Sequence, residues 1–211
     1  FGLAEYHKSD EFFDKRLEYT YRIVQIQEKK GNSTEKADAY QMLGLLYFDE
    51  HIYKKAIENF SEGFAQEGTS MNQRFEAGIW LTRSYQFSGQ SDSALYIARK
   101  LQFDEKRLTD FQRITLYKEK AEVYHSLGAY EEELGAYRSI VKAATGTTHN
   151  EFVPIAWNNI GYVYKYLQNE SESKSAFLNT LKTAPRDDNE LKAAANYNLG
   201  LILQNQGKSD S

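Results

Sequence analysis

Apolar residues recur along most of this sequence at the spacing of an α-helix. Trp157, Ile160, Gly161 and Tyr164, for example, stand at positions i, i+3, i+4 and i+7. Residues at this spacing share one face of a helix. Glycines, and pairs of neighbouring polar residues, interrupt the pattern and indicate turns. We therefore expect helical segments at residues 1–9, 10–30, 34–50, 53–67, 71–88, 91–103, 109–127, 130–144, 150–168, 170–183 and 187–206.

A small residue marks the same place in successive stretches of the chain, and we call these residues the anchors. They are Gly44, Thr82, Ala121, Gly161 and Gly200, separated by 38, 39, 40 and 39 residues. A tyrosine stands three residues after each of the first four anchors. Two further positions also recur. Sixteen residues after the anchors stand Phe60, Ala98, Tyr137 and Phe177, and twelve after stand Ala56, Ala94, Glu133 and Ser173, of which only Glu133 is not small. The chain is therefore an array of repeats.

One stretch carries a motif of known type. Trp157, Gly161, Tyr164, Phe177 and Pro185 follow the order and spacing W-x2-L-G-x2-Y…F…P, so the chain resembles the tetratricopeptide repeat (TPR) family. In that pattern the glycine lets a second helix approach, the phenylalanine fills the crossing, and the proline ends the second helix. The resemblance implies an all-α fold, an α-solenoid of stacked antiparallel helix pairs wound into a right-handed superhelix of about ten helices.

The repeat length of this chain differs from that of the family. The family period is about 34 residues, whereas this chain repeats every 38 to 40. Longer repeats look like the TPR-like arrays of bacterial regulators, which include peptide-pheromone receptors and the input domains of sensor kinases and transcription factors. Certain eukaryotic scaffolds also have repeats of about 40 residues, and the period alone does not choose between these groups. Because no linker divides the interior, we expect a single array over residues 1–211. We expect this sequence to be a fragment cut within its first and last repeats.

Composition excludes several classes of function. With 41% apolar and 27% charged residues the chain has the composition of a soluble globular protein. A net charge of −4 and the lack of a basic stripe argue against nucleic-acid binding by this fragment. No apolar run is long enough for membrane insertion. The absence of cysteine excludes disulfides, cysteine metal sites and thiol nucleophiles. The compartment stays open between the cytoplasm and, for an exported sensor domain, the periplasm.

The resemblance implies where a ligand would bind. In the family, the first helix of each pair lines an inner, concave groove that holds a peptide or a protein surface. On this sequence the candidate groove mixes aromatic, amide and basic side chains, which suit a peptide backbone and its apolar side chains. The candidate residues are Phe48, Ile79, Arg83, Phe87, Lys118, His125, Asn158, Asn159, Tyr162, Lys165, Tyr166, Tyr197 and Asn198.

Nothing in the sequence indicates catalysis. The four histidines are scattered and none lies in a metal-binding motif, so we expect no catalytic residue, no metal site and no cofactor. We interpret the chain as a non-catalytic module that binds a protein or peptide, as the sensor or interaction domain of a larger bacterial signalling protein. Two alternatives stay open: a structural scaffold or self-association domain that could form a homodimer, and a response-regulator phosphatase or peptide-pheromone receptor.

Overall fold

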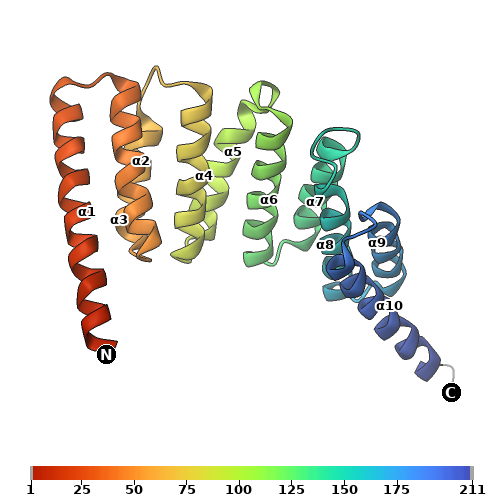
Figure 1. Ribbon diagram of the computed structural model, residues 1–211. Helices are drawn as coiled ribbons and strands as arrows, with labels where there is room; N and C mark the ends of the chain where they lie inside the picture. Colours follow the sequence, from red (N-terminus) through yellow and green to blue (C-terminus); the bar gives the residue numbers. More distant parts are fainter. Residues whose placement is uncertain (1, 210–211) are drawn as a thin grey trace. The chain divides into compact units, whose positions relative to one another are not determined.

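The computed structural model describes the backbone of residues 2–209 and the side chains of residues 12–205. Within these limits it consists of helices and turns only, which confirms the all-α prediction (Figure 1). The helices α2 to α10 begin and end within three residues of their predicted positions, and the short 3-10 helix η1 was not predicted. The elements are α1 (Gly2–Lys30), α2 (Ser33–Asp49), α3 (Tyr53–Ala65), α4 (Met71–Phe87), α5 (Ser91–Phe103), η1 (Glu105–Arg107), α6 (Asp110–Ser126), α7 (Tyr130–Ala144), α8 (Phe152–Tyr166), α9 (Glu170–Thr183) and α10 (Asn189–Ser209).

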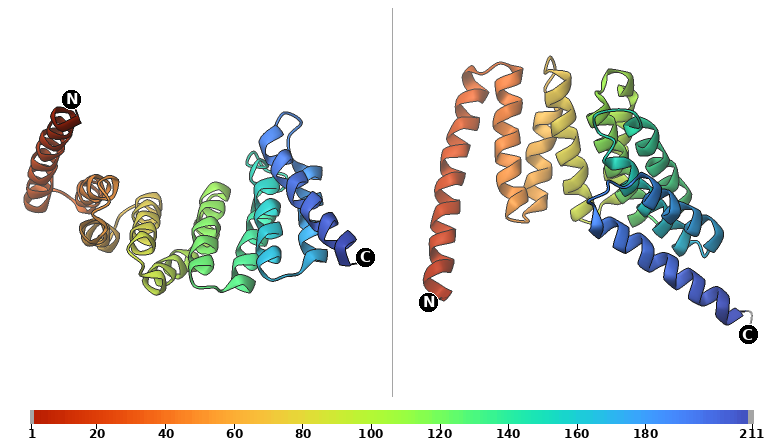
Figure 2. Two further views of the ribbon diagram at one scale, coloured as in Figure 1. Left: turned by 90° about the horizontal axis from the view of Figure 1, so that it is seen from below. Right: turned by 45° about the vertical axis from the view of Figure 1, so that its right-hand side comes forward.

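The first 30 residues differ from the prediction. We expected one helix to end by residue 9 and a second to start at residue 10, but α1 runs without a break from Gly2 to Lys30 (Figure 2). The expected turn, at residues 8–11, has the sequence Lys-Ser-Asp-Glu. It contains neither glycine nor proline, so nothing there stops a helix. The predicted turn is therefore wrong.

The chain divides into two compact units, residues 1–107 and 108–211. In the first unit α1 packs on α2, the helices α2 to α5 pack in succession, and α2 also reaches α4. In the second unit α6 to α10 pack in succession, and α8 also reaches α10. The pairs α2/α3, α4/α5, α6/α7 and α8/α9 are each joined by a three-residue turn. Each unit is thus built from stacked helix pairs, as predicted for a repeat fold.

The turn inside each pair has one geometry. The residue seven positions after the anchor has a left-handed backbone in all four pairs, although it is glycine in only two. The next residue donates its backbone N–H to the carbonyl of the recurring tyrosine, at 2.8 to 2.9 Å. This pattern is the Schellman motif, which satisfies the last carbonyls of a helix. The left-handed residues are His51 (φ 60°), Gly89 (φ 76°), Gly128 (φ 67°) and Gln168 (φ 56°).

The starts of the first helices also repeat. Twelve residues before each of the first three anchors, a polar side chain caps the helix and a Glu or Gln three residues later bonds back to the cap. These reciprocal capping boxes are Asn32–Glu35, Ser70–Gln73 and Thr109–Gln112. The fourth repeat has His149 at this place, and α8 begins only at Phe152. Pro154 lies in the first turn of α8, where its missing N–H needs no helical partner.

Two glycine anchors lie directly against a buried phenylalanine ring. A Cβ atom added at Gly44 would lie 2.6 Å from the Phe60 ring, and one at Gly161 would lie 2.6 Å from the Phe177 ring. Both rings are completely buried. The predicted role of these two glycines, to let the second helix approach closely, is therefore confirmed. Gly200 differs, because a Cβ there would meet nothing within 4 Å. The position sixteen residues after it lies past the end of this sequence.

At the anchor Thr82, a larger anchor side chain faces a smaller partner on the second helix. Thr82 replaces glycine, and the residue sixteen positions later is Ala98 rather than phenylalanine. Both side chains are completely buried, so the larger anchor is paired with a smaller partner.

A hydrogen bond also joins the two helices of the last pair. The Ser173 hydroxyl donates to the Gly161 carbonyl at 2.8 Å, which ties α9 to α8.

Candidate functional site

In the first unit a group of aromatic rings gathers where α2, α3 and α4 meet. The Phe48 ring lies 5.5 Å from Tyr53 and 5.6 Å from Phe87, and the Tyr53 and Phe87 rings stack at 5.4 Å and 19°. Trp80 joins them, 5.2 Å from Phe48, and the Arg83 guanidinium lies 4.8 Å over the Trp80 ring. The structure thus brings together the three predicted residues Phe48, Arg83 and Phe87. Phe87 is 61% exposed, so the group reaches the surface.

The second unit repeats this arrangement at equivalent positions. His125, Tyr130 and Tyr166 stand at the same distances from their anchors as Phe48, Tyr53 and Phe87. The Tyr130 and Tyr166 rings stack at 5.9 Å and 3°, and His125 lies 6.0 Å from the first and 5.6 Å from the second. We call these two groups the three-ring clusters. They join the predicted residues His125 and Tyr166 to Tyr130, which was not predicted.

The unusual Glu133 faces the second three-ring cluster. It takes the place where the other repeats have a small residue, and it is 3% exposed. Its Oε2 lies 3.1 Å from Nδ1 of His125, which is largely exposed. Burial raises the pKa of the Glu133 carboxyl, and the hydrogen bond to His125 opposes that rise. Burial, together with the nearby carboxylates of Glu133 and Glu122, raises the pKa of the Tyr137 hydroxyl as well.

An apolar pocket of about 140 Å³ lies between the first helices α6 and α8. Tyr137 and Ile140 of α7 contribute to its walls, and Ile155 of α8 borders it with a side chain that is 44% exposed. The predicted residues Lys118 and Asn159 also line it. The pocket opens between two first helices, where the sequence predicts a groove.

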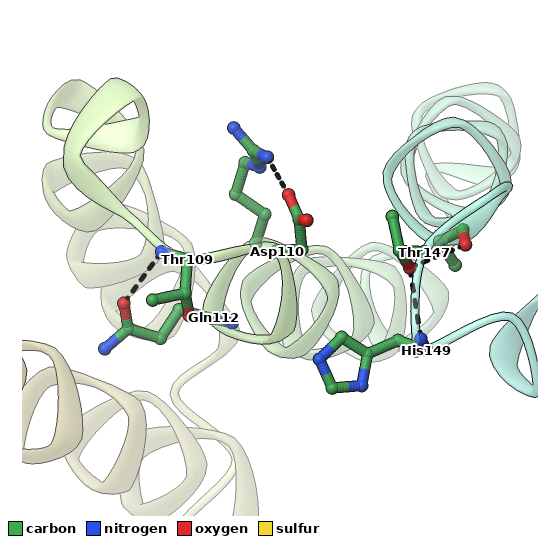
Figure 3. A network of polar contacts seen from close by, with 7 residues as sticks. Thr109, Asp110, Gln112, Thr147 and His149 are labelled. Atoms are coloured by element: carbon green, nitrogen blue, oxygen red, sulfur yellow. Dashed lines mark hydrogen bonds and ion pairs between the residues drawn. The ribbon is translucent and has the colours of Figure 1, made fainter.

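Further rings stand at one end of this pocket, near the start of α6. Phe111 lies 5.3 Å from His149 and 6.3 Å from Phe152, which itself lines the pocket. Figure 3 shows how the loop before α8 holds His149: the Thr147 hydroxyl accepts the His149 backbone N–H at 3.1 Å and donates to a carbonyl at the end of α7. The His149 ring points toward α6 in this view. The helix cap at Thr109 fixes the start of α6 beside it.

A polar network joins the predicted residues of α8 and α10. The Asn198 side-chain amide donates to the Tyr162 hydroxyl at 3.1 Å and to the Ala194 carbonyl at 2.9 Å. The Lys165 ammonium donates to the Asn198 side-chain oxygen at 3.1 Å. Asn198 is buried, and its bonds to two helices orient it. Asn159, Tyr162 and Lys165 thus follow one another along α8, from the apolar pocket to this network.

Not every predicted residue offers a surface to a ligand. Ile79 is 2% exposed and belongs to the core of the first unit, and Asn158 is also buried. The sequence pattern missed this because spacing along one helix does not show which of its faces the neighbouring helices cover. Tyr197 is exposed on α10. Asn198 is buried as well and acts through its bonds to Tyr162 and Lys165. We therefore keep the other ten residues as candidate contacts and leave out Ile79, Asn158 and Asn198.

Sequence reasoning also overlooked residues that shape the site. Tyr53 and Tyr130 are the first residues of α3 and α7, both nine positions after an anchor. Comparison of the repeats at that offset could have found them, because tyrosine recurs there. Ile155 and Phe152 precede the recurring motif, and no repeated pattern marks them.

The described part of the chain has neither a cluster of metal ligands nor a helix that could span a membrane. No group of three or more histidine, aspartate or glutamate side chains there could hold a metal ion. In the same residues, no helix combines the length and apolar character needed to cross a membrane.

Comparison with known proteins supports the repeat assignment. Residues 155–187 match the family description "Tetratricopeptide repeat". A sequence search of curated proteins found no match. Among solved structures, BtubC from P. vanneervenii has a TM-score of 0.68 at 14% identity, with 92% of this chain and 84% of that chain covered. The TPR-like repeats of a putative kinesin light chain from Podosopora anserina give 0.68 at 18% identity, with 86% and 92% covered.

A third solved structure places such repeats within a larger protein. It is a Signal Transduction ATPase with Numerous Domains (STAND) protein with a tetratricopeptide repeat sensor, from Pyrococcus horikoshii, with a TM-score of 0.68 at 16% identity. The alignment covers 92% of this chain but 31% of that protein. At these identities the likeness concerns the fold. Residues 155–187 are a tetratricopeptide repeat, and the chain as a whole has the fold of tetratricopeptide-like repeat proteins.

Proposed function

We propose that this chain is a non-catalytic module that binds a peptide segment of a partner protein along the groove of its second unit. The observation that carries the proposal is the apolar pocket between α6 and α8, with Lys118 and Asn159 on its walls. The pocket has room for one aliphatic side chain. Lys118 can attract an acidic group on the peptide, and the amide of Asn159 can bond its backbone. Tetratricopeptide repeats generally bind protein partners, which agrees with this reading.

The peptide would continue from the pocket toward α10. Tyr162 and Lys165 offer a hydroxyl and an ammonium group along that direction, and the buried Asn198 holds both through its hydrogen bonds. A groove whose polar groups are held in place loses less entropy when a ligand binds. The preferred ligand is therefore an extended segment with one aliphatic residue next to an acidic one.

A peptide library selected on the immobilised chain tests this proposal. We expect enrichment of the aliphatic–acidic pattern, with micromolar Kd values by fluorescence polarisation. Ile155→Ser should weaken binding of a selected peptide about tenfold, which corresponds to about 1.4 kcal/mol. Leu178→Ser is the matched control, because Leu178 is also an exposed aliphatic residue on a helix but lies on α9. Failure to enrich any peptide, or equal binding by the Ile155→Ser variant and the parent, would refute the proposal.

We further propose that the module serves as the sensor or interaction domain of a larger signalling protein. The similar fold of the STAND protein with a tetratricopeptide repeat sensor supports this role. Fusing the gene's flanking sequence to the module and measuring its output with and without a selected peptide would test it. An output that does not respond to a peptide bound at micromolar Kd would contradict the sensor role.

A specific feature of α1 favours the second candidate function, self-association. Phe12, Tyr19 and Ile26 are all exposed and are spaced seven residues apart, so they form one apolar stripe. A second copy of the chain could cover this stripe with its own. Light scattering on the parent and on the Tyr19→Lys variant measures whether the chain forms a dimer through this stripe. A dimer that becomes a monomer in the variant supports the scaffold, and a parent that is monomeric at high micromolar concentration excludes it.

A further inference from the structure

The positions that hold the rings in both three-ring clusters recur in the two other anchor pairs of the chain, with polar residues in each. We call the occurrence that lies within the second unit the third place. Each cluster is formed by the residues four and nine positions after one anchor and five positions after the next. Counted from Gly161 and Gly200, the same positions are Lys165, Glu170 and Asn205. These residues lie on α8, α9 and α10, three helices that all pack against one another. The third place therefore has polar residues where the two three-ring clusters have aromatic rings.

An open pocket of about 380 Å³ lies at this third place. Lys165, Glu170 and Asn205 all line it, and Leu201 and Ile202 of α10 form an apolar wall. In the equivalent places, the chain stacks Tyr53 on Phe87 and Tyr130 on Tyr166. The shorter or flexible side chains at the third place fill less of the same space. The pocket is thus a version of the three-ring cluster without its rings, and we call it the open slot.

We propose that the open slot binds a tyrosine side chain of a partner protein. The fold accommodates a stacked aromatic pair at two equivalent places, so its geometry suits a flat ring. Leu201 and Ile202 offer that ring an apolar face. The Lys165 ammonium and the Glu170 carboxylate can donate to and accept from a phenol hydroxyl, which a phenylalanine ring lacks. Tyrosine also occupies the position of Glu170 in both filled clusters.

The open slot goes beyond the peptide groove described above, although the two adjoin. Lys165 lines the slot and also bonds to Asn198 in the polar network. A partner held in the groove could therefore place a tyrosine in the slot, but the slot can be tested without any groove ligand. The methyl groups of Leu201 and Ile202 report on the slot, whereas that of Ile155 reports on the groove.

The test is a methyl NMR titration of the whole chain with N-acetyl-tyrosinamide, compared with N-acetyl-leucinamide. We expect saturable shifts at Leu201 and Ile202, with a Kd at least tenfold lower for the tyrosine compound. Glu170→Tyr combined with Asn205→Tyr installs the ring pair of the filled clusters and should abolish these shifts without lowering the unfolding midpoint. The control combines Ser171→Tyr with Gln204→Tyr, two exposed positions on the same helices, and should leave the shifts unchanged.

Several results would overturn the proposal. Equal affinity for the two compounds, or shifts only at Ile155, would mean that the slot does not select an aromatic ring. Shifts at Leu201 and Ile202 that persist in the Glu170→Tyr, Asn205→Tyr variant would place the compound elsewhere. A lower unfolding midpoint of that variant would contradict the equivalence of the three places. None of these results bears on the aliphatic pocket, which has its own variant, Ile155→Ser.

Discussion

Replacing Gly161 by alanine tests the packing on which every repeat depends. The new Cβ would lie 2.6 to 2.8 Å from three atoms of the Phe177 ring. Real Cβ atoms essentially never approach so closely, and the rigid ring is completely buried, so the helices themselves must move apart. Overpacking of this kind costs about 1–3 kcal/mol. Alanine regains about 1 kcal/mol of helix propensity over glycine, so we expect Gly161→Ala to be destabilising by up to about 2 kcal/mol.

Gly200→Ala is the control that isolates the packing term. Gly200 holds the same place in its repeat, but a Cβ there would meet nothing within 4 Å. The propensity gain is shared by both variants, so their difference in unfolding free energy approximates the overpacking cost of about 1–3 kcal/mol. Gly135→Ala, on the exposed side of α7, provides a second open site away from the last helix.

Urea unfolding followed by circular dichroism at 222 nm measures these differences. We expect the midpoint to fall for Gly161→Ala and to rise slightly for Gly200→Ala and Gly135→Ala. Combining Gly161→Ala with Phe177→Leu should recover part of the loss, because the smaller side chain yields space. If Gly161→Ala stabilised the chain as much as the two controls, the close contact between α8 and α9 would not exist in solution.

Two further predictions concern other parts of the repeats. At the left-handed turn position, Gln168→Gly should stabilise the chain by about 1 kcal/mol, and Gly128→Ala should destabilise it by a similar amount. Thermal unfolding measures both changes. Midpoints that shift in the same direction for the two variants would contradict the left-handed backbone at these positions. Glu133→Gln should change the dependence of stability on pH. Because burial raises the pKa of the folded Glu133 above its ordinary value of 4.5, the parent loses stability as the pH rises above 4.5. The variant lacks this loss, so its advantage in unfolding midpoint should be larger at pH 7 than at pH 4.5, and an equal advantage at both pH values would refute the burial effect.

The sequence predicted the helices well because their signals are local. The anchors, the recurring tyrosine and the capping boxes each lie within a single helix pair, so spacing alone locates the elements. The exception, α1, shows the limit of the method. A repeat register extended to residues 1–9 required a turn, but the residues there have no feature that breaks a helix.

The site was harder to predict, because it depends on contacts between helices. The spacing along one helix selected Tyr162 and Lys165, and the structure joins both to Asn198 in one network. The same spacing also selected Ile79, which is buried in the core. Whether a position at the edge of a helical face is covered depends on the size of side chains on neighbouring helices, which periodicity does not contain. The pocket beside Ile155 could not be predicted for the same reason, because it depends on side chains from three neighbouring helices.

The uniform three-residue turns have a consequence for engineering this protein. His51, Gly89, Gly128 and Gln168 adopt the same left-handed backbone despite their different side chains. The shape of the turn inside a helix pair therefore does not depend on its sequence. Turn residues can be exchanged between pairs while the two helices of each pair keep their angle.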